Sequence, residues 1–90
     1  MSWVESAWTR LRKLNEERIE LKKRCLISSQ DIEDDIEGDN YFAAEVDALL
    51  LAKYFARIAL VERELEGVQD LVDLWEKIQQ HNERIEGTDK

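Results

Sequence analysis

The segment that most constrains the fold is the run Phe42–Val61, which carries only four charged side chains, Glu45, Asp47, Lys53 and Arg57. The other sixteen side chains are apolar or Tyr, so a helix here has only a narrow polar stripe. Such a helix must be covered on nearly all sides, yet a domain of this size buries only about 60–65% of its unfolded surface. The run therefore predicts that a second copy of the chain, or another protein, covers part of this helix.

The pattern of breakers and apolar residues predicts a first helix over residues 3–36. Proline is absent and glycine occurs only at positions 38, 67 and 87, which favours long helices over many short strands. Arg18 interrupts the apolar stripe, and Ile36 extends it. The other members of the stripe recur at a three-four spacing: Val4, Ala7, Leu11, Leu14, Leu21, Cys25, Ser28 and Ile32.

A short turn at Gly38–Asn40 is expected to end this helix and begin the next. Gly38 is the expected left-handed C-terminal cap, and Asp39 or Asn40 is the expected cap of the following helix. Because the turn is short, the two helices are predicted to be antiparallel neighbours.

A second apolar stripe predicts a helical arm over residues 41–86. It passes Gly67 without losing phase, which favours one long arm, straight or kinked; the alternative is a third helix that begins after Gly67. Residues 87–90 are expected to form a frayed tail. We thus predict one all-α domain over residues 1–90, a long antiparallel hairpin in a dimeric helical bundle. The stripe consists of Leu51, Tyr54, Ile58, Val61, Leu65, Val68, Val72 and Trp75.

Folding at Asp39 places each residue opposite the one whose number is about 78 minus its own. This register sets a basic cluster of the first arm against an acidic cluster of the second, and Glu20 against Arg57. Such exposed pairs contribute little stability, but their agreement with the apolar stripes supports the hairpin. The two clusters are Arg10, Arg12 and Lys13, and Glu62, Glu64 and Glu66.

The net charge of −8 is concentrated around the predicted turn. Residues 31–50 hold eight acidic groups and no basic one, so we expect no direct binding to nucleic acid, which requires a basic surface. The acidic groups predict a surface that binds a protein partner; alternatively, they stand in for phosphates in an inhibitor of a DNA- or RNA-binding protein, of the kind phages encode. The predicted partner-binding surface consists of Asp31, Glu33, Asp34, Asp35, Glu37 and Asp39, and the phosphate mimic would also include Glu45 and Asp47.

A cytoplasmic protein without a membrane span is expected. The four charges of Phe42–Val61 would each cost about 2.5–3.5 kcal/mol near a bilayer centre. The first residues lack the basic-then-apolar order of a signal peptide. Cys25 is the only cysteine, so no internal disulfide forms, and its place on the apolar stripe predicts a buried side chain.

No catalytic site is predicted. The segment Glu16-Glu17-Arg18-Ile19-Glu20 resembles half of the acidic signature of MazG-like all-α nucleotide pyrophosphohydrolases, in which carboxylates of two helices hold Mg²⁺ on a triphosphate. The other half requires a Glu followed by Asp three residues later, and Glu33, Glu37 and Glu45 are followed there by Ile, Asn and Ala.

No metal site or cofactor is predicted either. If Gly38 is the sixth residue of a calcium loop, Glu33 is the first and Ala44 the twelfth, where such a loop needs Asp and Glu. Weak divalent-ion binding at these carboxylates stays open. His81 is the only histidine and has no acidic residue at the spacing of a di-metal motif.

The sequence thus predicts a non-catalytic protein-protein interaction module: a small acidic adaptor, chaperone or inhibitor that forms a homodimer. Alanines add a second face to the central helix, and one partner arm cannot cover both faces. The apolar residues predicted to bind a partner or a second copy are Ala48, Leu51, Ala52, Phe55, Ile58, Ala59 and Trp75.

Overall fold

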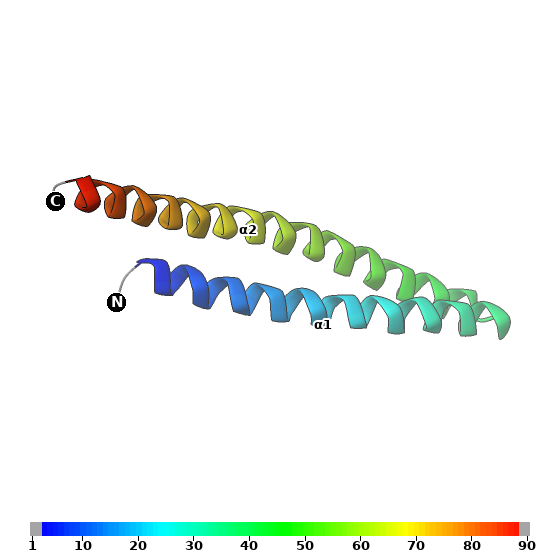
Figure 1. Cartoon of the computed structure of the whole chain (residues 1–90). Coiled ribbons are helices and arrows are strands. Elements are labelled where there is room, and N and C mark those ends of the chain that lie inside the picture. Colours follow the sequence, from blue (N-terminus) through cyan, green and yellow to red (C-terminus); the bar gives the residue numbers. More distant parts are fainter. Residues whose placement is uncertain (1–2, 89–90) are drawn as a thin grey trace.

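Two long helices form an antiparallel hairpin in the computed structural model, which describes residues 3–88 and the side chains of residues 3–82 (Figure 1). Helix α1 spans Trp3–Glu37 and helix α2 spans Tyr41–Thr88. The predicted all-α hairpin is confirmed, and the helix bounds agree to within two residues. Helix α2 includes Gly87 and Thr88, which were expected in the tail, and residues 89–90 lie outside the described part.

Helix α2 is continuous through Gly67, so the alternative of a third helix is wrong. The apolar stripe keeps its phase across this glycine, and the cost of one glycine in a helix, about 1 kcal/mol, is too small to break it. A Cβ atom placed on Gly67 would have no heavy atom within 4 Å. The glycine therefore serves no close approach between the helices.

The turn differs from the prediction in which residue adopts the left-handed conformation. Asp39 has a φ of 58°, whereas no glycine has a positive φ in the described chain. The Asp39 N–H donates to the Ile36 carbonyl (3.1 Å) and the Asn40 N–H to the Asp35 carbonyl (2.8 Å). These two bonds form a Schellman motif, whose geometry requires the left-handed residue at position 39.

Asn40 caps helix α2, as one of the two predicted alternatives. Its Oδ1 atom accepts a hydrogen bond from the Ala43 N–H (3.2 Å), which satisfies one of the donors left free at a helix start.

The seam between the helices contains the two predicted stripes. Its centre is a cluster of Leu14, Leu21, Val61 and Leu65, with four half-buried side chains packed against it. Ile36 does not belong to the seam, since its side chain is 49% exposed. The three-four spacing that passes through Ser28 and Ile32 leads to Asp35 instead, and Asp35 is half-buried. The four packed residues are Leu11, Tyr54, Ile58 and Val68.

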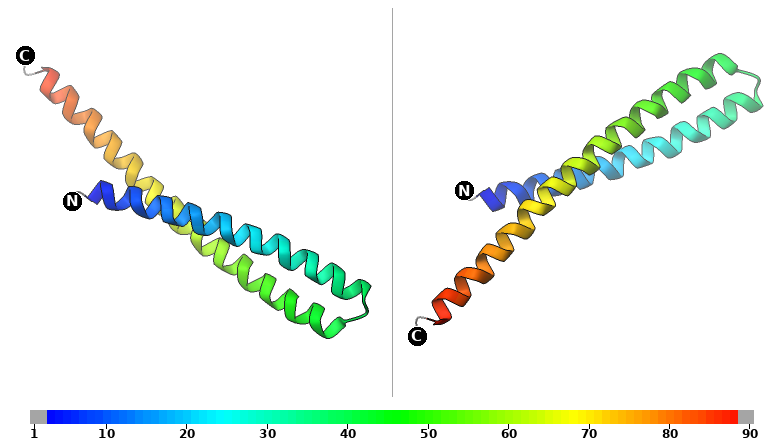
Figure 2. Two further views of the ribbon diagram at one scale, coloured as in Figure 1. Left: turned by 90° about the horizontal axis from the view of Figure 1, so that it is seen from below. Right: turned by 90° about the horizontal axis from the view of Figure 1, so that it is seen from above.

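The hairpin is a rod of 77 × 20 × 14 Å with a radius of gyration of 21.2 Å, whereas a compact domain of this length has about 12 Å. Helix α2 runs past the start of α1, as the two views of Figure 2 show. The accessible surface is 7027 Å², against about 5,500 Å² for a compact monomer of this mass. The chain therefore exposes more surface than a globular domain of its size.

Candidate protein-binding faces

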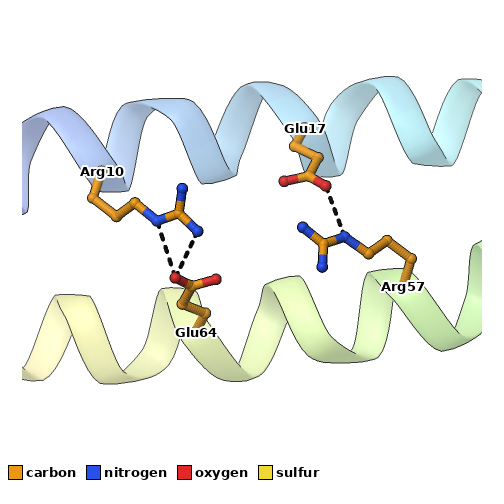
Figure 3. A network of polar contacts seen from close by, with 4 residues as sticks. All are labelled: Arg10, Glu17, Arg57 and Glu64. Atoms are coloured by element: carbon orange, nitrogen blue, oxygen red, sulfur yellow. Dashed lines mark hydrogen bonds and ion pairs between the residues drawn. The ribbon is translucent and has the colours of Figure 1, made fainter.

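Ion pairs between the helices lie on both sides of the hairpin. Arg10 lies 2.7 Å from Glu64, and Arg57 lies 2.8 Å from Glu17 (Figure 3). Each of these four residues comes directly before a seam residue, at positions 11, 18, 58 and 65. The resulting side of the hairpin is called the ion-pair face below.

The opposite side of the hairpin carries a third ion pair between the helices. Lys22 and Glu62, joined at 3.9 Å, each follow a seam residue, Leu21 and Val61. In a heptad, residues that precede and residues that follow the seam project to opposite sides of a helix pair. Lys22 and Glu62 therefore lie across the hairpin from the pairs of Figure 3.

The ion pairs confirm the predicted register in one case and correct it in another. Arg10 pairs with Glu64, as predicted, but Arg57 pairs with Glu17, and Glu20 pairs with Arg24 of its own helix. The hydrogen bond from Arg57 lowers the pKa of Glu17 and raises that of Arg57 itself. Because all these side chains are exposed, the pairs define the register more than they stabilise it.

Near the turn, small and polar side chains lie inside the seam and large apolar ones lie outside it. The seam here buries small or polar side chains: Ser28 is 5% exposed, and Cys25 and Ala44 are buried as well. Large apolar side chains point outward instead, with Phe42 79% and Leu26 73% exposed. Sequence analysis had placed Cys25 and Ser28 on the stripe but had not named Leu26 and Phe42 as the large residues left outside.

The predicted acidic surface is largely present. Five of its six carboxylates are exposed around the turn, and Asp35 is the exception. The Asp34 carboxylate accepts a hydrogen bond from Gln30 (3.0 Å), and that of Asp39 accepts one from the Tyr41 hydroxyl (3.1 Å). The exposed members are Asp31, Glu33, Asp34, Glu37 and Asp39.

Asp35 meets Asp47 across the seam, and sequence analysis did not foresee this pair. A shared hydrogen bond with Asp47, together with desolvation and the charges of Asp47, Asp31 and Asp34, raises the pKa of Asp35. Its buried Oδ2 atom has no hydrogen-bond donor. Two facing carboxylates repel one another unless they share a proton. The signal was available in the heptad phase, which places both residues on their stripes.

The structure divides the predicted apolar set. Ala48, Ala52, Phe55 and Ala59 are exposed and available to a partner. Leu51, Ile58 and Trp75 are half-buried, and Ile58 packs against the hairpin's own core.

Two carboxylates of the pyrophosphohydrolase resemblance form ion pairs. Glu17 is held by Arg57 and Glu20 by Arg24. Within the described part, no three Asp, Glu, His or Cys side chains are placed to hold a metal ion. A surface hollow of about 300 Å³ on α1 is lined by Ser6, Thr9, Arg10 and Lys13.

Neither helix, over the described residues, has a stretch apolar enough to cross a membrane. Comparisons with protein families, with curated proteins and with solved structures find no match to this chain.

Proposed function

We propose that this chain is a non-catalytic protein-interaction module whose turn half is covered by another protein chain. The observation that carries the proposal is the burial of a small polar residue near the turn, Ser28, while the large apolar residues Leu26 and Phe42 are exposed. Full burial of a large apolar side chain is worth about 1.5–3 kcal/mol. A surface that exposes several such side chains over one region is typical of an interaction site.

The balance of exposed and buried residues supports the same proposal. Among side chains that the structure describes, sixteen large apolar ones are exposed, whereas nine hydrophobic ones are buried. The hairpin alone leaves most of its apolar side chains in water. A small acidic adaptor, chaperone or inhibitor that works as a complex has this property. A cytoplasmic location is part of the proposal, and the free, buried thiol of Cys25 supports it.

A second candidate is an acidic mimic that occupies the nucleic-acid site of a DNA- or RNA-binding protein. The five exposed carboxylates around the turn favour it. Contacts of this kind are screened by salt, whereas apolar contacts persist. Salt therefore separates the two candidates.

The test immobilises the tagged chain and measures which proteins, including free copies of itself, stay bound at low and at high salt. Wild type is expected to retain a protein at both. The variant with Leu26, Ile27 and Phe42 all changed to Gln is expected to lose it while keeping its helical circular dichroism. A matched control changes Leu71, Leu74 and Ile78, three exposed residues far from the turn, to Gln and should bind as wild type does.

Two outcomes would count against the proposal. If wild type binds nothing at either salt and is a monomer at all concentrations, the chain is not an interaction module. If binding disappears at high salt and depends on Glu33 and Glu37, the mimic is correct instead.

A further inference from the structure

The turn half of the ion-pair face carries a patch of large apolar side chains. Ile27 of α1 and Val46 and Leu50 of α2 each come directly before a seam residue, which places them on this face. Leu49 and Phe42 lie beside them on α2, because residues 42, 46, 49 and 50 follow the three-four spacing of one helix side. All five are exposed, from 39% at Leu50 to 79% at Phe42. This set is called the turn patch below.

The two ion pairs of Figure 3 lie outside the turn patch, at mid-length of the same face. They are spaced by seven residues along each helix. The next step of seven towards the turn leads to Arg24 and Leu50, and the one after it to Asp31 and Ala43; neither is a pair of opposite charges. Arg24 pairs with Glu20 of its own helix instead. No ion pair of the described part of the chain therefore crosses the turn patch.

The rim of the turn patch is acidic. Asp31 and Asp34 come directly before the seam residues at positions 32 and 35, so they border the patch from α1, and both are exposed. Between Arg24 and Lys53 the chain holds eight acidic groups and no basic one. The patch thus combines exposed apolar side chains with unbalanced negative charge. A surface complementary to it is both apolar and basic.

A second copy of the chain does not supply such a surface. A two-fold contact through the turn patch would place two acidic rims together, and like charges repel. The basic segment of a second copy, residues 10–24, holds seven basic and three acidic groups. Its only exposed large apolar side chain is Ile19, however, so the segment has charge without an apolar stripe. The complementary surface therefore belongs to a different protein.

We infer that the turn patch binds an amphipathic helix of another protein, whose apolar stripe is bordered by Lys or Arg side chains. This inference rests on the proposed function and states the chemistry of its partner. The apolar stripe of the bound helix packs on Ile27, Val46 and Leu50, as a helix does in an apolar groove. Its basic side chains lie beside Asp31 and Asp34. The apolar contacts supply most of the affinity, while the opposite charges speed association and fix the orientation.

A labelled synthetic peptide serves as the probe, with Leu at three-four spacing along one side and Lys at the other positions. Fluorescence polarisation measures its dissociation constant with the whole chain. One control peptide has Glu in place of every Lys, and another has the same composition in scrambled order. The Lys peptide should bind, and the scrambled one should bind at least about ten-fold more weakly. The Glu peptide should not bind, because the acidic rim repels it.

Two double variants of equal chemistry test the position of the site. Val46→Gln with Leu50→Gln removes apolar contacts from the turn patch, so the Lys peptide should bind about ten-fold more weakly or worse. Leu71→Gln with Leu74→Gln makes the same change far from the turn, at exposed residues that also come directly before seam residues. This control should bind the peptide as wild type does. Circular dichroism checks that both variants keep their helices.

Two neighbouring residues test which side of the hairpin is used. Leu26 and Ile27 are 73% and 62% exposed, but only Ile27 comes directly before a seam residue, Ser28. Leu26 follows the seam residue Cys25 and thus lies on the opposite side. Ile27→Gln should weaken binding of the Lys peptide about five-fold, and Leu26→Gln should leave it unchanged.

Neutral variants of the rim test the part played by charge. Asp31→Asn with Asp34→Asn should weaken binding of the Lys peptide about five-fold at low salt. It should also make the affinity less dependent on salt, because two of the charges that attract the peptide are gone. Glu66→Gln with Asp70→Asn removes two exposed carboxylates far from the turn and should change neither quantity.

Three results would overturn this inference directly. The first is a Glu peptide that binds as tightly as the Lys peptide, since charge then selects nothing. The second is wild-type affinity in the variant of Val46 and Leu50, or a loss with Leu26→Gln and none with Ile27→Gln. The third is a dimer in light scattering that the variant of Val46 and Leu50 dissociates, because a second copy then occupies the patch.

The outcomes also separate this inference from the proposed function. If wild type retains a protein through Leu26 and Phe42 but does not bind the Lys peptide, the proposed function stands and the basic helix is wrong. A wild type that is monomeric and binds neither a protein nor the peptide overturns both.

Discussion

The centre of the seam and its turn end use the same heptad position in opposite ways. At the centre this position holds Leu14 and Val61, both fully buried. Towards the turn it holds Asp35 and Asp47, which face each other with one buried oxygen lacking a donor. The hairpin's own stability is therefore concentrated at its centre. The turn end keeps charge inside and large apolar residues outside, and this difference is the basis of the proposed contact with another chain.

The largest expected change in stability comes from a charge placed at the centre of the seam. Val61→Asp should destabilise the hairpin by about 3–5 kcal/mol, because it buries an unpaired carboxylate among Leu14, Leu21 and Leu65. Urea unfolding followed by circular dichroism measures this change. Leu60→Asp, at an exposed neighbour, is the control and should change stability by less than about 1 kcal/mol. Equal losses for both variants would mean that the centre does not hold the fold.

At the turn end of the seam, removing a charge should stabilise the hairpin. Asp35→Asn should raise the melting temperature at neutral pH, because it ends the repulsion with Asp47. The pKa of Asp35 is raised in the folded chain, so its stabilising contribution is complete below the ordinary Asp pKa of about 4. That contribution is lost as the pH rises through the folded-state pKa. The difference between variant and wild type should thus be largest at neutral pH and shrink in acid.

Glu17→Gln is the matched control for this pH dependence. The pKa of Glu17 is lowered by Arg57, so its contribution is present above the ordinary Glu pKa and is lost as the pH falls through the folded-state pKa. This variant should melt below wild type at neutral pH and converge with it in acid. The same sign for both variants would show that Asp35 and Asp47 are not in repulsion.

Gly67 should respond to substitution as an ordinary helix position does. Gly67→Ala is expected to stabilise the hairpin by about 1 kcal/mol, because alanine has the higher helix propensity and its methyl group meets no atom. A loss of stability in urea unfolding would indicate a close approach or a break at this position.

The smallest expected effects concern the turn itself. Gly38→Ala should raise stability by about 0.4–1 kcal/mol, since Gly38 has no positive φ and the added methyl makes only ordinary contacts with the carbonyls of Asp34 and Asp35. Asp39→Gly should also be neutral or stabilising, because it relieves a left-handed non-glycine residue. If Gly38→Ala were destabilising instead, the left-handed residue in solution would be Gly38.

Local pattern was sufficient to predict the elements of this hairpin. The three-four spacing of Leu14 and Leu21, the phase carried through Gly67, and the absence of other breakers each act within a few turns of one helix. The ion pair of Arg10 with Glu64 also agrees with the register predicted from the apolar stripes. These features depend on neighbours in sequence, which the sequence displays directly.

Tertiary structure decided everything that depends on how two helices meet. The Schellman hydrogen bonds select Asp39 for the left-handed conformation, although glycine is the usual choice one position earlier. Extending both stripes towards the turn brings Asp35 to Asp47, because they occupy the next seam positions after Ile32 and Leu51. Which apolar residues stay outside also depends on the small rotation of each helix about its axis. That rotation is set by packing between helices, and no single helix contains it.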